Sequence, residues 1–217
     1  MTVPAPRVAP TAAEVAFNAV TGPDFFRYHA FKRRMYAVGS LAAVSILVLS
    51  WVIRDAGDVF VTFIYPVAAI AVTVFTLLMV RAVVPLIVYE WTVMAAMSLF
   101  VFARLVWLLY IDGPIADRFL TLAAGHYWAL GMLIVAGFVL LSWRAAMTSG
   151  IVAIAGSAVL AAGAIPGLVT QAHPTAVVAA FIARIHVFLL LTLTLTSIVA
   201  VLREHLSEAT TRAEVLA

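Results

Sequence analysis

The chain has 217 residues, of which 65% are hydrophobic and 11% charged, and its mean hydropathy is +1.14. Soluble domains are about 45–50% apolar and about 25% charged, so this composition indicates an integral membrane protein. The formal net charge of +3 is explained by basic loops on the cytoplasmic side of a membrane and does not indicate nucleic-acid binding. The chain has no cysteine, which excludes disulfides, thiolate catalysis and cysteine-ligated metal sites.

Residues 1–35 are predicted to form a cytoplasmic N-terminal tail. At its end, residues 24–36 (DFFRYHAFKRRMY) mix aromatic rings with four cations, Arg27, Lys32, Arg33 and Arg34. This mixture predicts an amphipathic segment that lies among the lipid headgroups, with its cations toward anionic lipid. Membrane lipid is therefore the first expected partner.

Residues 36–202 are predicted to form a transmembrane sensor domain of six helices. The apolar runs are continuous and do not alternate, so helices are expected and a barrel is not. The short connections favour antiparallel neighbours in a bundle. The fifth span also contains a Gly163–Gly167 pair, which predicts close approach to a neighbouring helix. The six spans are about 36–53, 59–80, 86–111, 119–143, 150–170 and 175–202.

The positions of lysine and arginine predict the orientation of these spans. A six-span arrangement places nine of these cations on one side of the membrane and two, Arg54 and Arg118, on the other. By the positive-inside rule both termini are then cytoplasmic, and the chain lies in the inner (plasma) membrane. The nine are Arg7, Arg27, Lys32, Arg33, Arg34, Arg81, Arg144, Arg203 and Arg212.

Ionisable side chains inside spans are expensive, and four of them suggest a site in the outer half of the bundle. Counted at about 1.5 Å per residue from the outer ends, Arg104 and His126 lie about 10 Å deep, and Arg184 and His186 about 14 to 16 Å deep. The aromatic residues of this layer are Trp107, Tyr110, Tyr127 and Trp128. One interpretation is a ligand-binding pocket for a small anionic or aromatic molecule. The other is that Arg104 reaches the headgroups while the rings form an interfacial belt.

The same residues bear on cofactor binding and catalysis. His126 and His186 offer two imidazoles at similar depth, which would suit a haem, but a histidine that bonds a neighbouring helix is commoner. We expect no cofactor and no metal site. The only acid within a span, Glu90, lies near the inner end, which disfavours a proton-coupled transporter. We find no catalytic residues, since nucleophile elbows and phosphate-binding glycine loops are absent.

Residues 175–217 are predicted to form one helix that leaves the membrane and continues into the cytoplasm. No glycine or proline interrupts them, although the composition changes from apolar to REHLSEATTRAEVLA at Arg203. Apolar residues recur at alternating steps of four and three, which predicts the seam of a two-stranded coiled coil and hence a homodimer. Residues 203–217 are the cytoplasmic linker. The seam comprises Leu195, Val199, Leu202, Leu206, Ala209, Ala213 and Leu216.

The run from Leu202 to Ala217 resembles the helical linker that precedes the GGDEF domain of membrane-bound bacterial diguanylate cyclases. In that family a sensor of about six helices continues into such a linker, and the catalytic domain then opens with an Asp-x-Leu-Thr-Gly-x-x-Asn-Arg stretch. The resemblance implies that these residues are the N-terminal membrane sensor region of such a protein. It also implies that an output domain in the same parent chain makes cyclic di-GMP. Sensor histidine kinases use comparable linkers, and no catalytic residue of either family is present here.

The expectation from the sequence is therefore a membrane sensor that relays a stimulus through its last helix to a cytoplasmic output domain. The alternative is a small membrane transporter or channel subunit.

Overall fold

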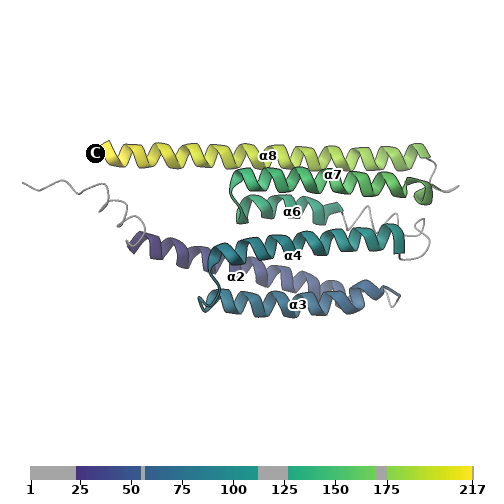
Figure 1. Ribbon diagram of the computed structural model, residues 1–217, viewed down its shortest axis with the longest axis horizontal. Coiled ribbons are helices and arrows are strands. Elements are labelled where there is room, and N and C mark those ends of the chain that lie inside the picture. The colour runs from purple at the N-terminus through teal and green to yellow at the C-terminus, as the bar shows by residue number, and fades with distance from the viewer. Residues whose placement is uncertain (1–22, 55–56, 112–126, 170–174, 217) are drawn as a thin grey trace, which may run out of the picture. The chain divides into compact units, whose positions relative to one another are not determined.

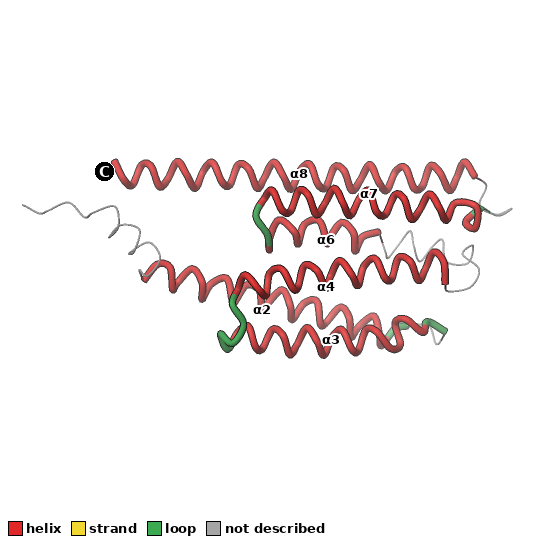
Figure 2. The backbone as a smooth tube through the Cα atoms, viewed as in Figure 1, coloured by secondary structure: helices red, strands yellow, loops and turns green. Residues whose placement is uncertain are grey.

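The computed structural model describes residues 23–54, 57–111, 127–169 and 175–216. These residues are helical apart from short turns, and no strand occurs among them (Figure 2). Five of the described helices are long and apolar enough to cross a membrane. A sixth, α6 (Tyr127–Leu140), is apolar but has only 14 residues. The chain is thus an all-α, multi-pass membrane protein. The beginning of the predicted fourth span, with His126, lies outside the described residues.

The chain divides into two compact units, Met1–Leu86 and Ile87–Ala217. In the first unit, α2 (Pro23–Val52) and α3 (Val59–Val80) form an antiparallel hairpin (Figure 1). The predicted amphipathic segment, residues 24–36, and most of the first predicted span lie in one continuous helix, α2. Polarity marks where a helix meets the headgroups and does not by itself end the helix, which needs a breaker or a cap.

Polar contacts close the hairpin at the turn between α2 and α3. The Asp58 carboxylate caps α3 by accepting a hydrogen bond from the Val61 amide at 3.1 Å. From α2, the indole of Trp51 donates to the Thr62 carbonyl at 3.2 Å, and Arg54 Nε donates to the Thr62 hydroxyl at 3.1 Å. The first bond satisfies an amide that the start of a helix leaves open. The Thr62 carbonyl is open to Trp51 because Pro66, four residues further along α3, has no N–H to donate to it.

The other end of α3 terminates without a glycine. Ala82 has φ of 61°, the left-handed conformation that usually falls to glycine after a helix. Its amide donates to the Met79 carbonyl at 3.0 Å, and the Val83 amide donates to the Leu78 carbonyl at 3.0 Å. This pair of bonds is a Schellman motif, and the alanine at its centre costs about 1–2 kcal/mol of backbone strain.

The second unit consists of the other helices. α4 (Leu86–Val106) continues into the π-helical turn η1 (Trp107–Ile111), and α6 is followed by α7 (Trp143–Leu168). The span expected from residue 150 therefore lies in a helix that already begins at Trp143. α8 (Thr175–Leu216) is 42 residues long and continues past the ends of α6 and α7 toward the C-terminus (Figure 1).

α7 packs through a stripe of small side chains. Every third or fourth residue of α7 is small and buried, which lets the neighbouring helices approach closely. At Gly150 a Cβ atom would lie only 2.5 Å from Cδ1 of Leu193 on α8. The predicted Gly163–Gly167 pair lies outside this stripe, because both glycines are exposed. The stripe comprises Ala146, Gly150, Ala153, Ser157, Ala161 and Ala164.

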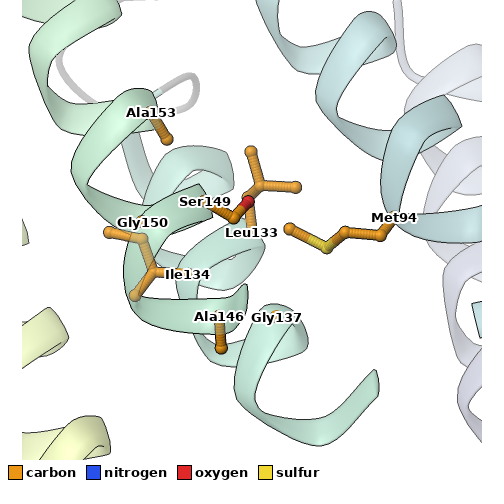
Figure 3. A pocket seen from close by; sticks show the side chains of 8 residues that line it. All are labelled: Met94, Leu133, Ile134, Gly137, Ala146, Ser149, Gly150 and Ala153. Atoms are coloured by element: carbon orange, nitrogen blue, oxygen red, sulfur yellow. The ribbon is translucent and has the colours of Figure 1, made fainter. Parts of the chain in front are cut away.

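A narrow space lies between α6 and α7 (Figure 3). Gly137 and Ala146 lie on either side of it, and the Met94 side chain of α4 reaches toward it. The space does not admit a water molecule. It is a packing gap between α6 and α7 and offers no room for a ligand.

Candidate functional site

The residues that were expected to form one layer have different environments in the structure. Arg104, in the last turn of α4, is 5% exposed. Arg184 is exposed on α8, and Trp128 is exposed on α6. His186 is half-buried between helices. Residues predicted to lie at a similar depth in the membrane therefore do not all point into the same part of the bundle.

Burial of Arg104 favours a role inside the protein. A side chain that reached the headgroups by snorkelling would expose its guanidinium, since the stem lies along apolar surface while the charge remains in water. Arg104 is almost fully covered by the protein. The snorkelling interpretation of Arg104 is thus disfavoured.

His186 makes a polar contact between α7 and α8. Its Nε2 lies 3.2 Å from the hydroxyl oxygen of Ser157, and its Nδ1 lies 2.8 Å from the carbonyl oxygen of Ile182 on its own helix. Because a carbonyl only accepts, Nδ1 carries a proton in this arrangement. Ser157 is 0% exposed. This residue was not singled out from the sequence.

The His186–Ser157 contact accommodates two proton arrangements. When the imidazole is neutral, Nε2 accepts a hydrogen bond from the Ser157 hydroxyl. When the imidazole is charged, Nε2–H donates to Ser157, whose own proton turns to the Ile154 carbonyl at 2.9 Å. The heavy atoms need not move between the two. The contact between α7 and α8 is therefore compatible with either arrangement.

Aromatic rings of α6 cover the same part of α8. The buried ring of Tyr127 meets the His186 ring edge-on, with centroids 5.9 Å apart, and meets Phe181 at 6.1 Å. Trp128 meets Phe188 at 5.4 Å. Edge-to-face pairs of this kind contribute about 0.5–1.5 kcal/mol each beyond burial. α8 is thus held on one side by Ser157 and on another by the rings of α6, and we call His186, Ser157 and Tyr127 the α8 clamp.

Tyr110 forms a second contact to α7, from the π-helical turn. Its hydroxyl donates to the Leu160 carbonyl at 2.7 Å, and it lies 2.8 Å from where a Cβ atom on Gly163 would be. Gly163 therefore makes room for the Tyr110 hydroxyl, which is a different role from the helix contact predicted for it. π-helical turns are rare and often occur at functional sites.

The arrangement bears on the haem hypothesis through His186 alone, because His126 lies outside the described residues. Both ring nitrogens of His186 are within hydrogen-bond distance of protein oxygens. A haem iron bound to Nε2 of His186 would have to displace the Ser157 hydroxyl. Among the residues that the structure describes, no group of three or more histidine or acidic side chains is placed to hold a metal ion.

Fold and site together define a class: a multi-pass, all-helical membrane protein in which a polar contact joins the long helix α8 to its neighbour α7. Comparison with known proteins adds nothing further, since the chain matches no protein-family model, no curated protein and no solved structure.

Proposed function

We propose that the chain is the sensor and relay module of a membrane signalling protein, in which α8 carries a change in the second unit to the cytoplasm. The observation that carries this proposal is that α8 is unbroken from Thr175 to Leu216. At about 1.5 Å per residue it is about 63 Å long, whereas the hydrocarbon core of a bilayer is about 30 Å thick. A continuous helix of this length can transmit rotation or displacement across the membrane boundary.

The two faces of α8 support a relay between partners. Three α8 residues are buried against the other helices of the second unit: Val178, Leu189 and Leu193. The predicted seam is exposed instead: Leu195, Val199 and Leu202 are 63%, 65% and 56% exposed. Residues 193 and 195 point about 200° apart on a helix. The protein's own core therefore leaves these three seam residues uncovered, and we propose that a second copy of the chain covers the seam.

The α8 clamp supplies the proposed point of control. A rotation of α8 would move His186 relative to Ser157 and Tyr127, so any stimulus that alters these contacts alters the position of α8. Arg184 lies two residues from His186, and Arg104 is buried in the same unit. We propose that a small anionic or aromatic ligand, or a proton on His186, acts here.

The proposed output follows from the resemblance of residues 202–217 to GGDEF linkers. On that basis the inner-membrane module controls a diguanylate cyclase, or by the same logic a histidine kinase, through the geometry of a dimer. The orientation that this requires, with both termini cytoplasmic, rests on the nine-to-two distribution of cations.

The test uses the absence of native cysteine to introduce one thiol at a time. In native membranes, Leu202→Cys on the seam should form a disulfide-linked dimer, whereas Glu204→Cys, exposed and about 200° away, should not. Adding Ser157→Ala should change the yield or rate at position 202. Equal cross-linking at both positions would contradict the seam, and an unchanged yield in Ser157→Ala would contradict the relay.

The alternative, a transporter or channel subunit, makes a different prediction. It requires solute or ion flux in proteoliposomes that contain the purified chain alone. It does not require the helix beyond Leu202. Flux that persists after removal of residues 203–217 would favour this alternative over the relay.

A further inference from the structure

The first unit contains a cavity of about 250 Å³ beside the end of α3. It is lined by Ala30, Arg33, Arg34 and Ala37 of α2 and by Val80 of α3. Two arginines thus line one small space together with apolar residues. A volume of this size is below the 300–1,000 Å³ of pockets for drug-sized ligands and suits a single headgroup.

Arg33 is held in place by the protein itself. Its guanidinium donates a hydrogen bond to the Met79 carbonyl, which also accepts from the Ala82 amide in the Schellman motif. A guanidinium has five N–H donors in a planar fork, so this bond leaves others for a ligand. Arg33 is therefore a pre-oriented donor, and Arg34, the next residue, is exposed at the same cavity.

The charge around the cavity is one-sided. Arg81 follows α3 directly and is exposed, and the Lys32 ammonium lies 5.6 Å from the ring centre of Tyr36. Among the hairpin residues whose side chains are described, the one carboxylate is Asp58, at the opposite end of α3. Such a field attracts an anion, and paired arginine forks match the oxygens of a phosphate.

The cavity also lies where apolar surface begins. The continuous apolar run of α2 follows Arg34 and that of α3 ends at Val80, which places Arg33 and Arg34 at the membrane boundary. Exposed apolar side chains lie next to it in sequence, among them Met35, Val38 and Leu77. A ligand that fits both surfaces has an anionic head and hydrocarbon tails.

We propose that this cavity, which we call the α2–α3 lipid site, binds the phosphate of an anionic glycerophospholipid, with its acyl chains along the exposed apolar faces of the hairpin. Arg33 and Arg34 hold the phosphate oxygens, and Val80, Ala30 and Ala37 contact the glycerol. The site is independent of the proposed relay. It involves a different unit of the chain and does not require a dimer.

The experiment uses the full chain in detergent micelles, with bound lipid measured by native mass spectrometry. Phosphatidylglycerol and phosphatidylcholine with identical acyl chains are the two probes, and glycerol phosphate is the soluble competitor. A lost charge-assisted hydrogen bond should weaken binding at least about tenfold. We therefore expect Arg34→Gln to lower phosphatidylglycerol retention about tenfold and the Arg33→Gln/Arg34→Gln double variant to abolish the preference over phosphatidylcholine.

Arg144→Gln is the matched control, because it removes one exposed cation in the other unit, at the start of α7. It should leave retention unchanged. Arg34→Gln keeps the bond between Arg33 and Met79, so its helical circular dichroism should equal that of the parent chain. A preference that survives in the double variant, or an equal loss in Arg144→Gln, would overturn the site. Binding of glycerol phosphate as tight as that of the whole lipid would overturn the assignment to lipid.

Discussion

Removal of the Ser157 hydroxyl tests the α8 clamp most sharply. Ser157 is fully buried and its oxygen lies 3.2 Å from His186 Nε2, so Ser157→Ala deletes the contact without exposing new surface. Hydrogen bonds between membrane helices contribute about 0.6 kcal/mol on average and up to about 1.7. Because Ser157 is completely covered, we expect a loss of about 1 kcal/mol, which is about fivefold in the unfolding equilibrium.

The assay is reversible unfolding in mixed micelles with increasing sodium dodecyl sulfate. Ser98→Ala is the matched control, since its hydroxyl donates only to the Met94 carbonyl of its own helix, at 2.8 Å, and its free energy of unfolding should change little. A double-mutant cycle of Ser157→Ala with His186→Phe should give a coupling free energy of about 1 kcal/mol. A coupling of zero would refute the reasoning, because the two side chains would then stabilise the fold independently.

Three further predictions concern other parts of the protein. Ala82→Gly should raise the free energy of unfolding by about 1 kcal/mol in the same assay, because glycine adopts a φ of 61° without strain; a loss of stability would contradict the Schellman assignment. Gly163→Ala should destabilise the protein by about 1 kcal/mol by displacing the Tyr110 hydroxyl, and Tyr110→Phe should remove most of that effect; the same loss in both backgrounds would contradict it. The purified chain should show no Soret absorbance, because His186 already bonds protein oxygens through both nitrogens; a Soret band that disappears in His186→Phe would contradict this.

Helix positions followed from the sequence where a physical signal marks them. α3 begins and ends as predicted, at Val59 and Val80, because Asp58 caps it and the apolar run stops at Arg81. α7 begins at Trp143, earlier than its apolar run suggests. Apolarity reports contact with lipid, whereas a helix also includes its polar turns outside the hydrocarbon. For the same reason the polar end of α2 belongs to one helix with its span.

The candidate site was harder to predict, because depth fixes only one of three coordinates. Arg104 and Arg184 were placed in one layer by counting residues, yet one is buried and the other exposed. Which side of each helix faces the bundle depends on how the helices pack, and this cannot be read from the residues around one position in a single sequence. No sequence pattern distinguished Ser157 from the other small residues of α7. Its role depends on a histidine 29 residues away.

The central claim, that α8 is one rod from the membrane into the cytoplasm, is tested most directly by the distance between spin labels at Leu191 and Arg212. The cysteine-free chain allows both labels to be placed specifically, and dilution with unlabelled chain removes distances between copies. An unbroken helix of 21 steps predicts one narrow distribution near about 32 Å. A broad or clearly shorter distribution would mean that the helix breaks near Leu202, and α8 would then have no mechanical means to carry a signal.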